Sequence, residues 1–230
     1  MKLTIVTGTV ERPPAIRRLV SSIFEHSRVP DWELIVADAS KEPLILKHSR
    51  VQVLHEWPRA GHAVGYNRAF RAARGEFVCW LNDDVVVTPG WDSAAVRFME
   101  ENPWCGLGAI YYSESGCCPH INFYPYQDMP YANFGIIRKT LGDKIGWFDE
   151  ECRMYGSDNS ITFKTVLAGY GVAGVRGSKV EHWPVLDEIK RQNVAGQAED
   201  ARHLMDIYRG KIDLIRNKMR RYPSSPMVTQ

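Results

Sequence analysis

Two adjacent acids, Asp83 and Asp84, follow Asn82 at the end of an apolar run that we expect to be a buried strand. Neighbouring carboxylates repel one another unless a cation or hydrogen-bond donors offset their charge. A hard divalent ion such as Mg²⁺ or Mn²⁺ takes oxygen ligands from one or two carboxylates together with phosphate oxygens. An Asp pair after a strand is also a common turn former or helix cap. The pair therefore indicates either a metal and phosphate site or an ordinary turn, and the surrounding elements must decide.

The first half of the chain alternates between strand and helix patterns. We expect strands at residues 3–7, 33–37, 51–55 and 76–81, and helices at residues 13–24 and 66–74. This alternation implies crossover connections and a mainly parallel sheet flanked by helices. Ligands of such sheets bind at the carboxyl ends of the strands, so Thr7, Gly8, Asp38 and residues 82–84 should converge on one crevice.

The second half is less regular. Residues 113–133 are rich in Pro, Gly, Cys and aromatics, among them Tyr124, Tyr126 and Tyr131, and a segment of this length without clear elements is usually functional or mobile. A helix is predicted at residues 158–168, strands at 172–175 and 179–182, and one or two amphipathic helices at 187–222. We expect an α/β domain over residues 1–186 and a helical C-terminal extension over residues 187–230, packed on the same domain.

Composition indicates an ordinary globular chain. Apolar residues make up 44% and charged residues 24% of 230 residues, which excludes disordered and fibrous classes and suffices for one core. The net charge of +2 is too small to argue for nucleic acid. Basic residues near the end usually form a solvated helix face, with a patch for phosphate or membrane as the alternative. They are Arg209, Lys211, Arg216, Lys218, Arg220 and Arg221.

The apolar runs and the cysteines of the sequence indicate where in the cell the protein is expected. The longest apolar runs, at residues 77–81 and 85–87, are far shorter than the ~20 residues of a membrane-spanning helix, and the start resembles a strand more than a signal peptide. Five cysteines form an odd set without a repeated metal spacing, which favours reduced thiols. A zinc site at Cys117, Cys118 and His120 is disfavoured by the adjacent cysteines and the missing fourth ligand. We expect a cytoplasmic protein, with a peripheral position at a membrane as the alternative.

Short motifs flank the acid pair in a fixed order. Residues 59–67 read R-A-G-H-A-V-G-Y-N, residues 73–76 read A-R-G-E, and P-G-W follows at residues 89–91. This order resembles family 2 glycosyltransferases, which show N-x-G-x-x-x-A-x-N, A-x-G-E, an apolar strand, D-D-D or a relative, and P-G-W or similar. The resemblance implies the nucleotide-binding α/β fold called GT-A. The positions in register are Gly61, Asn67, Ala73, Gly75, Glu76, Asp83, Asp84, Pro89, Gly90 and Trp91.

The resemblance extends to both sides, over roughly residues 3–183. Residues 35–40, I-V-A-D-A-S, are similar to a V-V-D-D-G-S strand end and keep the acid, Asp38, that the family uses against the nucleobase. Residues 146–150, G-W-F-D-E, resemble the G-G-F-D-E segment of the acceptor side. Residues 155–159, Y-G-S-D-N, resemble the start of the E-D-x-D-L helix, with Ser157 in place of the usual Glu. Residues 180–182, V-E-H, resemble a late V-x-H that supplies a metal ligand.

Residue roles follow from this resemblance. It implies a Mn²⁺ or Mg²⁺ ion held by Asp84 and His182, a general base at Asp158, and acceptor contacts from Trp147 and Ser157. A His before Trp-Pro can equally be a core residue, and an acid at a helix start can be an ordinary N-cap or first-turn acid. Donor contacts are expected from Thr7, Gly8, Glu11, Asp38, Arg59, Gly61, Asn67, Asn82 and Asp83.

The resemblance therefore implies a metal-dependent, inverting glycosyltransferase that uses a nucleotide sugar, with UDP- or dTDP-sugars favoured. We expect a carbohydrate or lipid-linked glycan as acceptor, with nucleic acid as a less favoured partner through the basic tail. A sugar-nucleotide pyrophosphorylase is an alternative, but the glycine-rich, Arg-bearing loop of that class is absent because residues 7–13 hold one glycine. A non-catalytic nucleotide-binding scaffold is a second alternative, although a scaffold needs none of Asp38, Asp84, Asp158 and His182.

Overall fold

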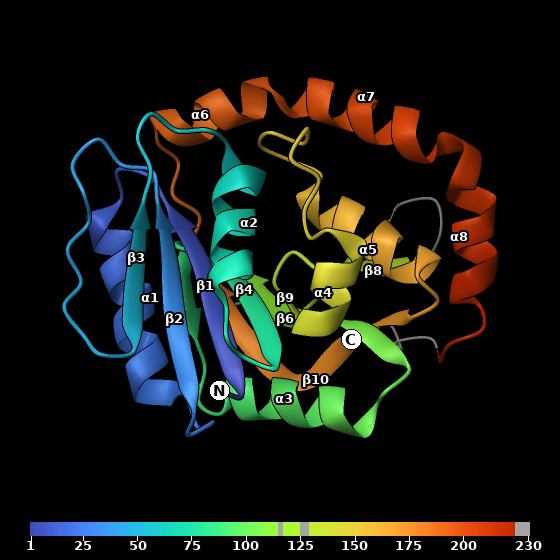
Figure 1. Ribbon diagram of the computed structural model, residues 1–230, viewed down its shortest axis with the longest axis horizontal. Helices are drawn as coiled ribbons and strands as arrows, with labels where there is room; N and C mark the ends of the chain where they lie inside the picture. The colour runs from blue at the N-terminus through green and yellow to red at the C-terminus, as the bar shows by residue number, and fades with distance from the viewer. Residues whose placement is uncertain (115–116, 125–128, 224–230) are drawn as a thin grey trace.

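The computed structural model describes residues 1–114, 117–124 and 129–223. An eight-stranded sheet, in the order β3-β2-β1-β4-β9-β6-β10-β5, forms the centre, and the C-terminal helices arch over one end of it (Figure 1). Its strands are β1 (Leu3–Thr9), β2 (Trp32–Asp38), β3 (Val51–His55), β4 (Phe77–Asn82), β5 (Val85–Val87), β6 (Cys105–Glu114), β9 (Gly135–Arg138) and β10 (Gly171–His182). A separate two-stranded sheet pairs β7 (Asn122–Tyr124) with β8 (Met129–Tyr131).

Helices separate the strands along the chain. They are α1 (Pro13–His26), α2 (His62–Ala72), α3 (Trp91–Glu101), α4 (Lys139–Ile145), α5 (Ser157–Leu167), α6 (Glu188–Ala195), α7 (Gln197–Tyr208) and α8 (Ile212–Met219), with a 3₁₀ turn, η1 (Arg209–Lys211), before α8.

Most strands of the large sheet run in one direction. β3, β2, β1 and β4 are mutually parallel, and β6 is parallel to β10. β9 lies antiparallel between β4 and β6, and β5 lies antiparallel at the edge beside β10. The carboxyl ends of β1, β2, β4, β6 and β10 therefore lie along one edge of the sheet. The predicted α/β class with a mainly parallel sheet is confirmed.

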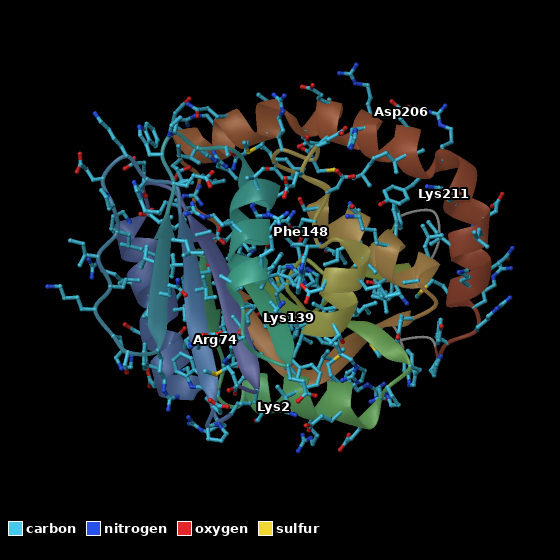
Figure 2. The ribbon with its side chains drawn as sticks, viewed as in Figure 1. Lys2, Arg74, Lys139, Phe148, Asp206 and Lys211 are labelled. Carbon is cyan, nitrogen blue, oxygen red and sulfur yellow. The ribbon has the colours of Figure 1, made fainter. Side chains whose placement is uncertain are left out.

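Alternating side chains divide the interior into two cores, one on each face of the sheet. Ile5, Leu34 and Cys79 pack with α1 and α3, whereas Val6 and Ile35 pack with α2, α5 and the C-terminal helices. Successive side chains of a strand point to opposite faces, so a parallel sheet covered by helices on both sides has one core on each face. Figure 2 shows Phe148 inside the molecule and Asp206 on the outside of the C-terminal arch.

The first helix carries a residue to the rim of the sheet. α1 begins at Pro13, whose fixed φ and missing N–H suit the first helical positions. Its apolar stripe of Ile16, Leu19 and Ile23 is fully buried. Because the helix starts four residues after β1 ends, its N-cap residue, Arg12, is held beside the carboxyl end of the sheet.

Several elements differ from the sequence-based expectation. α2 begins at His62 rather than near residue 66, and the two strands expected at 172–175 and 179–182 are one strand, β10, with a register shift between Val175 and Lys179. The tail forms three α-helices instead of one or two. β7 and β8 lie in the segment expected to lack clear elements, and Tyr126 of that segment lies outside the described residues.

The C-terminal helices contact the rest of the chain at several points. Tyr208 and Ile215 are buried in the core beside α5, and Lys218 Nζ donates to the carbonyl of Leu167 at 2.7 Å. The boundary at residue 186 stays a prediction. Among the helices of the described segments, none combines the length and the apolar character needed to cross a bilayer.

A single carboxylate ties α7 to the loop before α5. Asp200, which is 3% exposed, accepts hydrogen bonds from the backbone N–H groups of Arg153, Met154 and Tyr155 at 2.8–2.9 Å. Asp200→Ala leaves these three donors without their partner, so it should lower the free energy of unfolding by about 2–4 kcal/mol. Urea unfolding measures this loss. Asp206→Ala, an exposed site on the same helix, is the matched control, and equal losses for the two variants would refute the role of Asp200.

Candidate active site

A pocket opens at the carboxyl ends of β1, β2 and β4. Ten of the residues singled out from the sequence line it, together with residues from the starts of α2, α5 and α6. They are Gly8, Asp38, Arg59, Gly61, Asn82, Asp83, Asp84, Ser157, Asp158 and His182. The convergence expected from parallel strand ends is therefore present, and it includes Asp158 and His182 from the second half of the chain.

Strand pairing places His182 beside Asp84. The antiparallel register of β10 and β5 pairs His182 with Val85, and the backbone N–H of Trp183 donates to the Asp84 carbonyl at 2.7 Å. As a result, His182 Nε2 lies 3.4 Å from Asp84 Oδ1. The other ring nitrogen, Nδ1, lies 2.7 Å from Glu114 Oε1. Glu114 was missed in the sequence because it reaches the site only through the pairing of β6 with β10.

The charges of this group depend on one another. Burial opposes ionisation of both partners, but the Asp84 and Glu114 carboxylates outweigh it and raise the pKa of His182. Burial by itself would raise the pKa of Asp84, but the hydrogen bond and charge of the neighbouring His182 have the larger effect and lower the pKa of Asp84. Asp84 Oδ1 is buried and has no hydrogen-bond partner among the described residues. A buried carboxylate oxygen next to an imidazole nitrogen fits a divalent cation such as Mn²⁺ or Mg²⁺.

The partners of Asp83 come from the end of β1 and the start of α1. Its Oδ2 accepts a hydrogen bond from Thr9 Oγ1 at 2.7 Å, and its Oδ1 lies 3.3 Å from Arg12 Nη1. Burial raises the pKa of Asp83 to about 6, although the Thr9 hydroxyl and the Arg12 guanidinium oppose the rise. The two adjacent acids therefore occupy different surroundings, one among hydrogen-bond donors and the other beside an imidazole.

Arg12 joins the first helix to the C-terminal segment. Its Nε and Nη2 donate to both carboxylate oxygens of Asp187, at 2.7 and 2.8 Å. Asp187 in turn caps α6 by accepting from the backbone N–H of Lys190 at 2.8 Å. The bonds to Arg12 hold the pKa of Asp187 at about 2. Arg12 and Lys190 both line the pocket and place positive charge beside the acids. Arg12 was not among the predicted donor contacts, although Pro13 marks the start of a helix and so places Arg12 at its N-cap.

The base of the pocket at β1 and β2 is tightly built. A Cβ on Gly8 would lie 2.6 Å from Cε2 of Tyr66, so only glycine lets the strand end approach this ring. Tyr66 Oη donates to the carbonyl of Leu81 at 2.7 Å. Asp38 accepts bonds from the backbone N–H groups of Ser40 and Leu44 at 3.1 and 2.7 Å, and its Oδ2 lies 3.1 Å from His55 Nδ1. These contacts fix the Asp38 carboxylate at the pocket wall.

Asp158 enters the pocket from the first turn of α5. The helix begins after Gly156, whose φ of 86° lies in the left-handed region, and Asp158 Oδ1 accepts from the backbone N–H of Asn159 at 2.9 Å. Burial raises the pKa of Asp158 to about 6, partly opposed by that bond. A carboxylate with a pKa near neutrality is well placed to accept a proton. Beside it, the Ser157 hydroxyl is buried without a hydrogen-bond partner among the described residues.

Four predicted site residues lie outside this pocket. Trp147 is a core residue: it is 3% exposed, its ring stacks on Phe70 at 4.6 Å, and its Nε1 donates to Asp143 at 3.0 Å. Its ring fills the space over Gly142, so the structure places it behind the pocket wall, and the contact with an acceptor stays a prediction. Its neighbour Phe148 lines the pocket instead.

The other three residues support the pocket from behind or lie beside it. Thr7 is fully buried in β1. Glu11 belongs to a second hollow with Ser40, where its Oε1 accepts from the backbone N–H of Lys41. Asn67 is 1% exposed, and its amide bonds both the N–H and the carbonyl of Phe148 at 3.0 Å. Direct contacts of these three residues with a donor stay predictions.

Comparisons with known proteins agree with this architecture. The sequence model of glycosyl transferase family 2 matches residues 4–155, about two-thirds of the chain. The chain belongs to this family. The resemblance found in the sequence is therefore confirmed.

Two curated relatives illustrate the range of the family. The O-antigen biosynthesis protein RfbC of Myxococcus xanthus is 24% identical over 79% of this chain and 17% of its own length. An uncharacterized glycosyltransferase of Bacillus subtilis, YwdF, is 27% identical over 67% of this chain and 65% of its own length. The chain thus spans less than two-thirds of either relative.

Solved structures share the fold. S. aureus TarS 1–349 in complex with UDP-GlcNAc superposes with a TM-score of 0.65, at 18% identity, over 82% of this chain and 60% of that one. The mannosyltransferase PcManGT from Pyrobaculum calidifontis, in complex with GDP-Man and Mn²⁺, also gives 0.65, at 17% identity, over 98% of this chain and 66% of that one. At these identities the likeness establishes the fold.

The supporting role of Asn67 can be measured. Asn67→Ala removes the amide that bonds Phe148 and also Glu150 Oε1, so it should lower the free energy of unfolding by about 2–3 kcal/mol. Asn82→Ala, at the pocket rim, should cost less than about 0.5 kcal/mol. Chemical denaturation of both variants measures these losses. An unchanged free energy of unfolding in Asn67→Ala would contradict the supporting role of the Asn67 amide.

Proposed function

We propose that this protein is an inverting glycosyltransferase that moves a sugar from a nucleoside-diphosphate sugar to an acceptor hydroxyl. The observation that carries the proposal is the convergence of four residues from separate segments of the chain on one pocket: Asp38, Asp84, Asp158 and His182. Family membership supports it, as do the nucleotide sugars bound by the structural neighbours.

The chemistry of the pocket walls supports one orientation of the donor. The nucleoside would lie against Gly8 and Asp38 at the ends of β1 and β2, where ligands of parallel sheets bind. The diphosphate would then face Arg12 and Lys190 on one side and Asp84 and His182 on the other. UDP- or dTDP-sugars stay our first expectation for the donor.

Asp84 and His182 are the residues that would hold Mn²⁺ or Mg²⁺, with Glu114 orienting the imidazole through Nδ1. When bound, such an ion neutralises charge on the departing nucleoside diphosphate. Manganese in a structural neighbour of this fold supports the assignment.

Asp158 is the general base of the proposed reaction. Its carboxylate takes the proton of the acceptor hydroxyl while that oxygen bonds to the anomeric carbon and the bond to the diphosphate breaks. Attack from the side opposite the nucleotide inverts the anomeric configuration. The adjacent Ser157 hydroxyl is free to bond the acceptor, because no described residue takes it.

We further propose a carbohydrate or lipid-linked glycan as acceptor, in polysaccharide biosynthesis. The O-antigen relative supports this substrate class. All five cysteines are free, which suits the cytoplasmic location that the sequence predicts.

Substitution of the two key acids should separate donor binding from transfer. Asp158→Asn should reduce kcat by about 10²–10⁴-fold, because it removes the base, and leave donor affinity unchanged. Asp84→Asn should abolish the gain in donor affinity that Mn²⁺ provides. A thermal-shift screen of nucleotide sugars with Mn²⁺ selects the donor, calorimetry measures binding, and NMR of the product gives the anomeric configuration. Asp206→Asn is the surface control, and normal turnover by Asp158→Asn would disprove the base assignment.

The acid limb of the rate should follow Asp158. Its pKa of about 6 means that the carboxyl is protonated, and unable to accept a proton, at lower pH. kcat/KM should therefore fall about tenfold per pH unit below pH 6 and level off above it. Initial rates between pH 4.5 and 8, with donor binding measured in the same buffers, test this. A rate that stays flat down to pH 4.5 would rule out Asp158 as the titrating base.

A further inference from the structure

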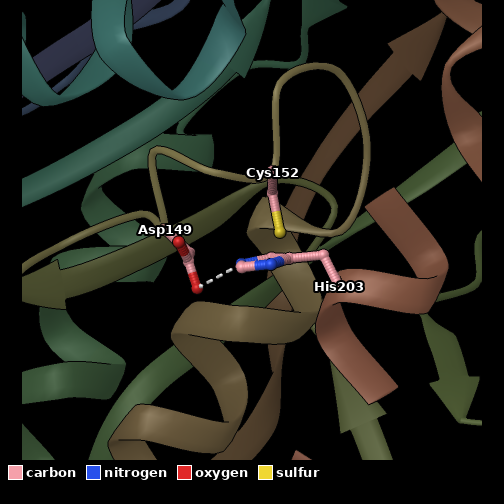
Figure 3. A group of neighbouring side chains, drawn as sticks. All are labelled: Asp149, Cys152 and His203. Carbon is pink, nitrogen blue, oxygen red and sulfur yellow. Dashed lines mark ion pairs between the residues drawn. The ribbon is translucent and has the colours of Figure 1, made fainter. Parts of the chain in front are cut away.

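A second group of potential metal ligands lies outside the pocket, between the loop before α5 and the helix α7. Asp149 and Cys152 come from the loop, and His203 comes from α7 (Figure 3). One ligand atom of each residue lies within 4.8 Å of those of the other two. None of the three lines the active-site pocket, although Asp149 belongs to the segment 146–150 that resembles the acceptor side of the family.

The spacing of the ligand atoms suits a tetrahedral ion. Zinc binds sulfur at about 2.3 Å and nitrogen or oxygen at about 2.0–2.2 Å, which places tetrahedral ligands about 3.3–3.8 Å apart. Asp149 Oδ2 and His203 Nε2 are already 3.4 Å apart. Cys152 completes the set if its sulfur moves slightly towards the other two ligand atoms. Cys152 follows Asp149 by three residues, in a turn closed by the hydrogen bond from Cys152 N to the Asp149 carbonyl, so both side chains can face one point.

The hydrogen bonding of His203 points to a missing ligand. Its Nε2 is buried and makes no hydrogen bond within the described part of the chain, although Asp149 lies at ion-pair distance. Its Nδ1 lies 3.2 Å from Glu151 Oε2. A carboxylate on the outer nitrogen is the arrangement that directs the lone pair of the other nitrogen towards a metal.

The chemistry of the three ligands selects the ion. A thiolate, an imidazole and a carboxylate together favour Zn²⁺ over Mg²⁺ or Mn²⁺, which prefer oxygen ligands. The Cys152 side chain is fully buried, as are most structural thiols, and it would release its proton to solvent on binding. A water molecule would complete the tetrahedron, because the described residues supply three ligands at this place.

We propose that Asp149, Cys152 and His203 form a structural zinc site that fastens α7 to the loop leading into α5. The ion acts together with Asp200, one turn earlier on α7, which binds the backbone of residues 153–155 in the same loop. Because Met154, Tyr155, Ser157 and Asp158 line the pocket, the zinc site holds the wall that carries the base.

Cobalt substitution provides the test, with readouts independent of sugar transfer. The full chain carries Cys117→Ser and Cys118→Ser, because those exposed thiols could bind metal adventitiously, and Asp84→Asn, which removes the other metal site. After chelation, one equivalent of Co²⁺ should produce a thiolate-to-cobalt charge-transfer band, and Zn²⁺ should displace it. Zinc at a hundredfold excess over Kd should raise the Tm by about 5–10 °C.

Single variants test which residues give rise to the charge-transfer band. Cys152→Ser should abolish it, whereas Cys105→Ala, a buried thiol elsewhere in the fold, should retain it. Glu151→Gln should weaken zinc binding about 10–100-fold, as loss of an outer partner does. His203→Gln should weaken it further. His203 is 22% exposed, so this variant keeps the test decisive if Cys152→Ser fails to fold.

Two outcomes overturn the proposal. One is the absence of a cobalt band and of any zinc-dependent rise in Tm in the parent protein, which would leave an ion pair beside a buried thiol. The other is a band that persists undiminished in His203→Gln or Cys152→Ser. Either result leaves the proposed transfer reaction untouched, since that rests on the Asp84 and Asp158 pocket.

Discussion

The candidate site depends above all on the register of β10 between its two neighbours. β10 pairs in parallel with β6 and antiparallel with β5, so one short segment aligns Asp84, His182 and Glu114. In a strand, a slip of one residue turns every side chain to the opposite face. Residues 176–178 have no partner in β6, and this irregularity, with Gly177 at a φ of 85°, sets the register that brings His182 opposite Glu114. A local irregularity outside the pocket lining thereby determines the geometry of the proposed metal ligands.

The pocket holds acidic and basic side chains close together, and most but not all of their polar atoms have a hydrogen-bond partner within the protein. Asp83 is satisfied by Thr9 and Arg12, and Arg12 by Asp187, whereas one oxygen of Asp84 stays buried without a hydrogen-bond partner among the described residues. A buried, unsatisfied carboxylate oxygen is costly, so such a group is expected where a ligand supplies the missing partner. The same reasoning applies to the ring nitrogen of His203 in the second cluster.

The C-terminal helices belong to the construction of the site. Asp187 bonds Arg12 at the start of α6, Lys190 faces the pocket, and Asp200 fixes the loop that leads to Asp158. Their arch over the end of the sheet brings residues separated by up to 175 positions into contact (Figure 1). These helices therefore connect the expected donor side of the pocket with the expected acceptor side.

Sequence patterns were enough to predict the α/β class, the family and most residues of the pocket. Hydrophobic period and turn residues are local properties, and parallel strands place their carboxyl ends on one edge, so Asp38 and Asp84 could be brought together without coordinates. Asp158 was assigned through the family resemblance of residues 155–159, since local patterns alone allowed an ordinary first-turn acid. Tertiary structure alone decided which polar and aromatic residues near those motifs face the pocket. Trp147 and Asn67 carry the right chemistry but turn into the core, because the space over Gly142 and the backbone of Phe148 accommodate them. Glu114 reaches the site through the pairing of β6 with β10, and Asp187 orients the Arg12 side chain; both are long-range contacts that leave no periodic signal in the chain.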